Sequence, residues 1–282
     1  MSMNQGASSI HGIEHYENFP VASFLCPPRL RPAITAIYWF ARTADDLADE
    51  GDALPAKRLA DLADYRADLL ACVLGKRVSG RWPEVFARLS PAIGQFALPT
   101  ALLTDLLSAF EQDVTKTRYA SQAELLDYCR RSANPVGRLL LHLYKVSDNQ
   151  SLEQSDCICS ALQLINFWQD LGVDIPHGRI YLPFDSFAQH GVDEAMLLHQ
   201  DVNPATTSLV AANVFWAQTL MQQGAPLVKK IPGRAGWDLR LVVQGGLRIA
   251  EKIKQLNFAT LRQRPKLNVW DGVVMLWRAV WM

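Results

Sequence analysis

Apolar residues recur every three to four positions along most of the chain, the period of an α-helix with one buried face. This pattern predicts helices over residues 33–50, 56–74, 99–115, 122–132, 136–146, 155–173, 193–198, 206–227, 237–259 and 270–281. Glycine and proline interrupt the pattern, which predicts loops over residues 51–55, 75–83 and 176–183 and a kink or break at Pro135. No segment alternates apolar and polar residues as a strand does, and no repeat or linker divides the chain. We therefore predict an all-α fold in which residues 1–282 form a single domain.

Two of the predicted helices carry aspartates one turn apart. At about 100° per residue, each of two polar sets falls on one stripe of its helix. The first stripe is Tyr38, Arg42, Asp45 and Asp49, and the second, provided that the helix persists through Gly172, is Gln163, Asn166, Asp170 and Asp174. The first stripe alone could be an ordinary solvated face. The second lies in a mostly apolar segment, residues 160–174, so its polar side chains should point into a buried space.

Buried aspartates of this kind need a positive partner. Unpaired carboxylates are unfavourable in an apolar interior, and a cation removes the problem. Oxygen ligands with no histidine or cysteine nearby favour Mg²⁺ over zinc. Because Mg²⁺ binds phosphate oxygens as well as carboxylates, the implied substrate is a phosphoryl compound, which Arg42 is placed to hold. The chain has no P-loop and no G-x-G-x-x-G, so a nucleotide is not indicated.

The amino-acid composition indicates which classes of ligand and partner the protein can bind. Hydrophobic residues make up 49% of the chain, enough for a large core and for a central apolar cleft that suits a greasy substrate tail. The 28 basic and 28 acidic residues cancel, which predicts no nucleic-acid partner and no global attraction to an anionic membrane. The five scattered cysteines are typical of reduced thiols, and we find neither a secretory signal nor a membrane span. We therefore expect a cytoplasmic protein.

The segment NVWDGVVMLWRAVWM, residues 268–282, holds three tryptophans in a short amphipathic stretch. Such a segment is typical of a terminal helix packed on the core. It is also typical of a helix that lies on a membrane surface, where an apolar product would be delivered. The second interpretation would place the protein peripherally at the inner face of the membrane.

Three segments resemble the motifs of the squalene/phytoene synthase family. They are RTADDLADE at 42–50, QLINFWQDLGVD at 163–174 and IPHGRIYLP at 175–183, the last being similar to the family's G-R-x-Y-x-P continuation. Their order and spacing extend the resemblance over nearly the whole chain. It implies a helical bundle of the isoprenoid synthase type that uses Mg²⁺ and a prenyl diphosphate.

The resemblance also implies roles for individual residues. The implied Mg²⁺ ligands are Asp45, Asp49, Asp170 and Asp174, assisted by Asn166. The implied diphosphate contacts are Ser23, Arg42 and Gln163, with Tyr38 as a further substrate-binding residue on the first stripe. Tyr128 matches the family tyrosine that lies near the ionising carbon.

Some residues keep two interpretations. Arg179 either closes over the diphosphate or pairs with Asp174 or another acid. Asn134 either positions a water molecule or caps and kinks the helix before Pro135. The aromatic rings of Phe19, Phe40 and Trp168 either stabilise a carbocation or pack in the core.

Two further segments, HYENFPVAS at 15–23 and YCRRSANPVG at 128–137, most resemble the bacterial branch of the family that makes hydroxysqualene in a three-protein route to squalene for hopanoids. This resemblance predicts that the enzyme ionises presqualene diphosphate and captures the rearranged cation with water. It also predicts contact with neighbouring enzymes of that route. Three alternatives stay open: a family member that makes squalene, presqualene diphosphate or phytoene, for example from farnesyl diphosphate; a non-catalytic subunit that binds prenyl diphosphates; and a terpene cyclase.

Overall fold

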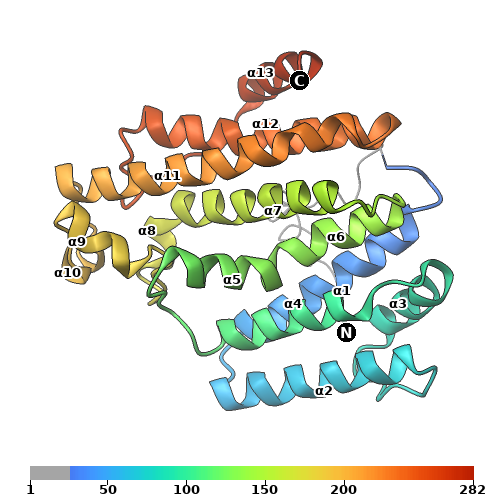
Figure 1. Cartoon of the computed structure of the whole chain (residues 1–282). Helices are drawn as coiled ribbons and strands as arrows, with labels where there is room; N and C mark the ends of the chain where they lie inside the picture. The colour runs from blue at the N-terminus through green and yellow to red at the C-terminus, as the bar shows by residue number, and fades with distance from the viewer. Residues whose placement is uncertain (1–25) are drawn as a thin grey trace, which may run out of the picture.

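The computed structural model describes residues 26–282, and these form a bundle of α-helices without a β-strand (Figure 1). The elements are α1 (Arg31–Asp49), α2 (Pro55–Val73), α3 (Pro83–Phe96), α4 (Thr100–Asp113), α5 (Gln122–Ser132), α6 (Asn134–Leu143), α7 (Asn149–Gln169), α8 (Leu171–Asp174), η1 (Phe184–Ser186), α9 (Phe187–His190), α10 (Glu194–Leu198), α11 (Pro204–Gly224), η2 (Ala225–Lys229), α12 (Gly233–Gln255) and α13 (Val269–Val280). Each predicted helix has a counterpart with shifted ends, although the one predicted over residues 155–173 is divided between α7 and α8, and the all-α prediction is confirmed.

Helix α3 is an element that the apolar pattern did not predict. It starts with Pro83 in its first turn, where proline is tolerated, but it also contains Pro91, which removes a backbone hydrogen bond. The helix forms because Phe86 and Leu89 bury one of its faces in the core beside α1 and α2. Tertiary packing therefore outweighs the local effect of the inner proline.

Helix α7 runs through the middle of the bundle, with α11 and α12 on one side and α5 and α6 on the other (Figure 1). One hydrophobic cluster surrounds it and includes Trp168 and Leu209. A second cluster, which includes Phe40 and Leu103, joins α1 to α2, α3 and α4. Helices α4 and α6 contribute buried residues to both clusters, and α1 lies in the second; all three carry residues of the candidate site.

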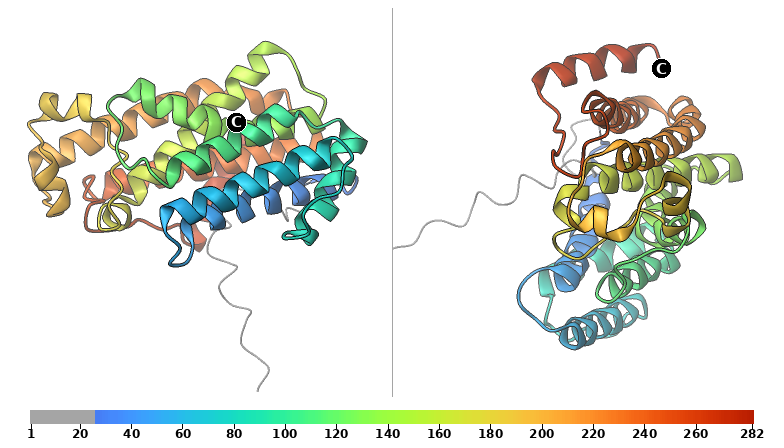
Figure 2. Two further views of the ribbon diagram at one scale, coloured as in Figure 1. Left: turned by 90° about the horizontal axis from the view of Figure 1, so that it is seen from below. Right: turned by 90° about the vertical axis from the view of Figure 1, so that its left-hand side faces the viewer.

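Helix α13 lies at the outer edge of the bundle, across α12 (Figures 1 and 2). Within it only Asp271 and Ala279 are buried. The interpretation of this segment as a helix packed in the core is therefore wrong. Within residues 26–282, no helix is both long and apolar enough to cross a bilayer.

Candidate active site

The first acidic stripe lies on one unbroken helix, α1. The opposite face of α1 is buried through Ala36, Phe40 and Ala44, which turns the stripe away from the second core cluster. Arg42 lies on the stripe, and its guanidinium forms ion pairs within the helix, at 3.3 Å to Asp45, 2.7 Å to Asp46 and 2.6 Å to Glu50. Arg42 is therefore held among acids of its own helix.

The second stripe is broken, so the predicted helix through Gly172 is wrong in its continuity. Helix α7 ends at Gln169, and the short helix α8 begins at Leu171. The Gly172 N–H donates to the Thr260 carbonyl oxygen at 3.0 Å instead of to its own helix. A Cβ at Gly172 would lie 2.8 Å from the Leu261 carbonyl oxygen, so only glycine fits this approach. The Asp174 N–H still donates to the Asp170 carbonyl oxygen at 2.9 Å, which keeps the two aspartates one turn apart.

Two arginines from distant segments pair with these aspartates. Arg179, in the loop after the second motif, donates from both terminal nitrogens to Asp49 of the first motif, in one case at 2.7 Å. Of the interpretations that the sequence left open, this is pairing with an acid. Arg264 follows α12 and donates from Nε and, at 3.2 Å, from Nη2 to Asp170. The loop after the second motif thus crosses to the first motif and ties the two together.

The carboxyl groups of both motifs share one electrostatic environment. Burial, reinforced by the charge of Asp49, raises the pKa of Asp45 to about 6. Burial and the charge of Asp170 raise the pKa of Asp174 to about 7, and Asp49 adds to this rise. The charge of Asp49 therefore acts on an aspartate of each motif. Arg179, which pairs with Asp49, also donates its backbone N–H to the Asp174 carbonyl oxygen at 3.0 Å, so the ends of the two stripes lie beside a common space.

Asp113 at the end of α4 is a further candidate site residue, one that was not predicted from the sequence. It accepts a hydrogen bond at 2.8 Å from the hydroxyl of Tyr128, and its other carboxylate oxygen is buried without a hydrogen-bond partner. Burial and the charges of Asp49 and Asp45 raise the pKa of Asp113 to about 7. Asp113 lies four and seven positions after Ala109 and Leu106, which are both buried. An aspartate on an apolar helical face was the signal, the same one that identified the second stripe.

Tyr128 lies in an aromatic cluster beside these acids. Its ring contacts Tyr119 and Phe167, and Phe167 stacks on Tyr181 with ring centroids 3.7 Å apart. Burial raises the pKa of the Tyr128 hydroxyl well above its usual value, so this hydroxyl stays protonated and donates to Asp113. The cluster joins α5 and α7 to the loop that carries Arg179.

The remaining predicted residues have different surroundings. Tyr38, Gln163 and Asn166 are partly buried on their stripes. Asn134 is the first residue of α6, and its Oδ1 accepts a hydrogen bond at 2.9 Å from the Ser160 hydroxyl of α7. Pro135 therefore lies in the first turn of a new helix. Ser23 lies outside the described residues.

Two of the three aromatic residues considered for stabilising a carbocation lie in the described part of the chain. Phe40 is fully buried and stacks on Tyr65, with ring centroids 5.2 Å apart, on the far side of α1 from the stripe. Trp168 is also fully buried in the core. Core packing is thus the correct interpretation for both rings, while Phe19 lies outside the described residues.

Within residues 26–282 no group of three or more His, Cys, Asp or Glu side chains is arranged to hold a metal ion. The acids pair with arginines instead. The residues nevertheless suit a hard divalent cation, because the donors are all carboxylates and several have raised pKa values caused by burial and crowded like charges. A cation would relieve both effects.

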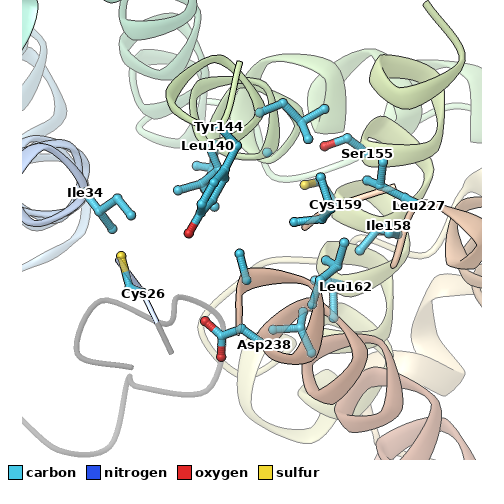
Figure 3. Close-up of a pocket in the computed structure, with 17 residues that line it drawn as sticks. Cys26, Ile34, Leu140, Tyr144, Ser155, Ile158, Cys159, Leu162, Leu227 and Asp238 are labelled. Carbon is cyan, nitrogen blue, oxygen red and sulfur yellow. The ribbon is translucent and has the colours of Figure 1, made fainter. Parts of the chain in front are cut away.

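An apolar cavity of about 120 Å³ lies between α1, α6, α7, η2 and α12 (Figure 3). Figure 3 shows Ile158, Leu162 and Leu227 on one side of it, and Cys26 and Tyr144 on the other. This confirms the predicted apolar cleft. The lining is mostly aliphatic, with few polar side chains in it.

The cavity and the acids occupy the same faces of two helices. On α1, Ile34 lines the cavity and lies one turn before Tyr38 on the acidic stripe. On α7, Leu162 lines the cavity one turn before Asn166, and Asp170 follows after another turn. At about 1.5 Å per residue, the cavity begins about 12 Å from Asp170 along the axis of α7. The site therefore combines a charged end with an apolar end.

A fold of this kind, with two acidic motifs facing an apolar cleft, defines an isoprenoid synthase. The family model for squalene/phytoene synthase matches residues 14–271, and the chain belongs to this family. The fold is close to that of the squalene synthase HpnC from Alicyclobacillus acidocaldarius, with a TM-score of 0.79 and 33% identity, covering 86% of this chain and 90% of that one. A dehydrosqualene synthase solved with a ligand shares the fold at a TM-score of 0.77, covering 91% of this chain and 88% of its own, with 23% identity.

The chain is also similar to curated members of the family, among them hydroxysqualene synthases and a phytoene synthase. The hydroxysqualene synthase of Sinorhizobium fredii is 34% identical over 269 residues, which cover 94% of this chain and 89% of the relative. The hydroxysqualene synthase of Zymomonas mobilis is 43% identical over 183 residues, which cover 64% of this chain and 59% of the relative. The phytoene synthase of Thermus thermophilus is 28% identical over 270 residues, or 94% of this chain and 88% of the relative. The resemblance seen in the motifs is thus confirmed.

Proposed function

We propose that this enzyme converts presqualene diphosphate and water into hydroxysqualene and diphosphate, with the help of Mg²⁺. One observation carries the proposal: acids of two motifs, joined by Arg179, lie at one end of helix faces whose other end lines an apolar cavity. Such a site suits a molecule with a charged head group and an apolar hydrocarbon tail, and a prenyl diphosphate is such a molecule. The relatives named hydroxysqualene synthase support this reaction among those of the family.

The carboxylates supply the proposed metal ligands. We assign Mg²⁺ to Asp45, Asp49, Asp170 and Asp174, with Asn166 assisting. When bound, the metal would supply positive charge to the oxygens of the departing diphosphate. The raised pKa values of Asp45 and Asp174 support the assignment, because burial and neighbouring carboxylates disfavour the charged form of each group, and a cation would stabilise that form.

The arginines supply the proposed diphosphate contacts. Arg179 and Arg264 now pair with Asp49 and Asp170, which are proposed metal ligands. We propose that, when a cation takes those carboxylates, the guanidinium groups donate to phosphate oxygens, to which each can donate two parallel hydrogen bonds. Arg42 remains beside Asp45, and we assign it the same role. Tyr38 and Gln163 complete the proposed contacts among the described residues.

The reaction proceeds by loss of the diphosphate. The carbon–oxygen bond breaks with its electron pair leaving on the diphosphate, and the cation rearranges in a cavity whose aliphatic walls exclude most water. A water oxygen then forms the new carbon–oxygen bond and releases one proton to the solvent. The Tyr128 hydroxyl, fixed by Asp113, provides an oriented dipole at the charged end of the site.

Asn134 remains our proposed residue for positioning that water. Its Oδ1 accepts from the Ser160 hydroxyl, so any water would be held by the side-chain amide as a donor. The variant Asn134→Ala should lower the share of hydroxylated product. Product analysis that shows unchanged hydroxysqualene from this variant would remove Asn134 from the mechanism.

A direct assay tests the proposed function. The purified protein is incubated with Mg²⁺ and either presqualene diphosphate or farnesyl diphosphate, with and without a nicotinamide reductant, and the products are identified by mass spectrometry. We expect hydroxysqualene from presqualene diphosphate without any reductant. The similarity to a solved squalene synthase makes squalene the second candidate. Turnover of farnesyl diphosphate alone would overturn the proposal, and no metal-dependent diphosphate release would favour a non-catalytic subunit.

A further inference from the structure

Helix α13 presents a continuous row of large apolar side chains to its surroundings. Trp270, Trp277 and Trp281 are 78%, 65% and 75% exposed. The exposed large apolar residues of this segment are Val269, Trp270, Val273, Leu276, Trp277, Val280 and Trp281. At about 100° per residue they fall within about 140° of the helix circumference, so they form one face. Trp277 and Trp281 contact each other edge to face, with ring centroids 5.9 Å apart.

The opposite face of α13 is fixed to α12 by ionic and polar contacts. Asp271 accepts from Arg248 at 2.7 Å and from Lys252 at 2.6 Å. At the other end, Arg240 donates to the carbonyl oxygen of Ala279 at 3.0 Å. An Asn268 capping box starts the helix. The helix is therefore held at both ends with its apolar face turned outward, and that orientation is built into the fold.

Other exposed large apolar side chains lie singly or, as with Leu70 and Leu74 at the end of α2, in a pair. Leu54 and Leu74 lie at opposite ends of α2, and Leu198 lies on α10. Single exposed apolar residues are normal on a protein surface, whereas a contiguous patch marks a binding surface. The tryptophan face of α13 is thus distinct from the rest of the described surface.

Charge is also unevenly distributed, although the net charge is zero. Residues 202–282 hold 11 Lys and Arg against three Asp and Glu, while residues 1–201 hold 17 against 25. Lys266 is exposed just before α13, and Lys254 is exposed near the end of α12. Arg240 lies over the ring of Trp237, 5.1 Å from its centroid, beside the other end of α13. The balanced composition therefore conceals a basic C-terminal part that an anionic surface would attract.

We propose that the tryptophan face of α13 binds the surface of a lipid bilayer that carries anionic headgroups. Tryptophan suits the boundary between headgroups and acyl chains, because its ring is apolar and its N–H is a donor. An amphipathic helix of this length with flanking cations lies in the plane of that boundary. A protein partner would also cover apolar rings, but it would not account for the excess of cations in residues 202–282. The proposal rests on α13 and its charges, independently of the reaction.

Vesicle binding tests the proposal with the full chain. Sedimentation is measured with vesicles of phosphatidylcholine alone and of phosphatidylcholine mixed with phosphatidylglycerol. The wild type should bind the mixed vesicles at least about tenfold more tightly than the neutral ones, and added salt should weaken binding. The triple variant W270S/W277S/W281S should bind at least about tenfold more weakly than the wild type. The matched control L54Q/L74Q removes exposed apolar residues elsewhere and should bind as the wild type does.

Further measurements keep the test decisive. Circular dichroism and thermal unfolding should be unchanged in the triple variant, because its three side chains are exposed. The charge variant K254E/K266E should lose much of the preference for anionic vesicles while keeping binding through the tryptophans. Equal binding by the triple variant, or equal binding to neutral vesicles, would overturn the proposal. So would a dimer in analytical ultracentrifugation that the triple variant abolishes, because a second copy would then cover the face.

Discussion

The two acidic motifs differ in how the backbone carries them. The first lies on the continuous helix α1, where the chain itself keeps Asp45 and Asp49 one turn apart. The second lies across a break between α7 and α8, and Asp170 is the residue between the two helices. In α8 the Gly172 N–H donates to the Thr260 carbonyl oxygen. The first motif therefore depends on local helix geometry, and the second depends on a contact between segments about 90 residues apart in the chain. This difference teaches that equal spacing in the sequence can arise from unequal physical causes.

The largest effect should come from removing one carboxylate in either motif. Asp45→Asn and Asp174→Asn should each reduce diphosphate release from presqualene diphosphate by roughly 10³-fold, about 4 kcal/mol, because each removes a proposed metal ligand. Asp52→Asn changes an exposed aspartate beside the first motif and serves as the control. Steady-state kinetics measure the effect. A loss in one motif only would show that the motifs do not act together.

The next effect concerns stability and pH without Mg²⁺. Asp174 has a folded-state pKa of about 7 against an ordinary 3.8, so its contribution is fully present below about pH 4 and is lost as pH rises through 7. Between pH 4 and 8 the unfolding free energy of the wild type should fall by about 2–4 kcal/mol relative to that of Asp174→Asn. Denaturant titrations measure this difference. Added Mg²⁺ should restore stability to the wild type at pH 8. A difference in unfolding free energy between the two proteins that does not change with pH would contradict the raised pKa of Asp174.

The break in the second motif should be sensitive to one methyl group. Gly172→Ala places a Cβ against the Leu261 carbonyl, so we expect a loss of about 2–3 kcal/mol of stability together with reduced activity. Gly94→Ala is the matched control, because Gly94 lies in α3 with open space around it and should gain roughly 0.5–1 kcal/mol. Thermal unfolding compares the two. Equal changes in stability for the two variants would mean that the contact between Gly172 and the Leu261 carbonyl does not restrict the residue at this position.

The smallest effect should be the coupling between the motifs. A double-mutant cycle on Arg179→Gln and Asp49→Asn, measured by unfolding without Mg²⁺, should give an interaction energy of about 1 kcal/mol, because the pair is about one-third exposed. The coupling should disappear at saturating Mg²⁺ if the carboxylate exchanges its arginine for a cation. A coupling that persists with Mg²⁺ would contradict that exchange.

Several residues of the candidate site could be proposed from the sequence, and others could not. Asp45, Asp49, Asp170 and Asp174 stood out because acids on helical stripes are visible in local spacing. Asp113 carried the same signal in a weaker form, as a single acid on an apolar face. Arg264 had no local signal, because its role depends on where the segment after α12 returns to the bundle. Its partner Asp170 lies 94 residues earlier in the chain.

The sequence by itself determined most of the helices, the first stripe and the amphipathic character of residues 268–282, because each follows from the 3.6-residue period of a single helix. The tertiary structure decided which faces meet. It paired Arg179 with Asp49 and placed Asp113 where it accepts a hydrogen bond from Tyr128. It also ended helix α7 before Gly172 and left the tryptophans of α13 exposed. Such contacts join residues that are distant in the chain, and only the packing of the whole bundle determines which of them come together.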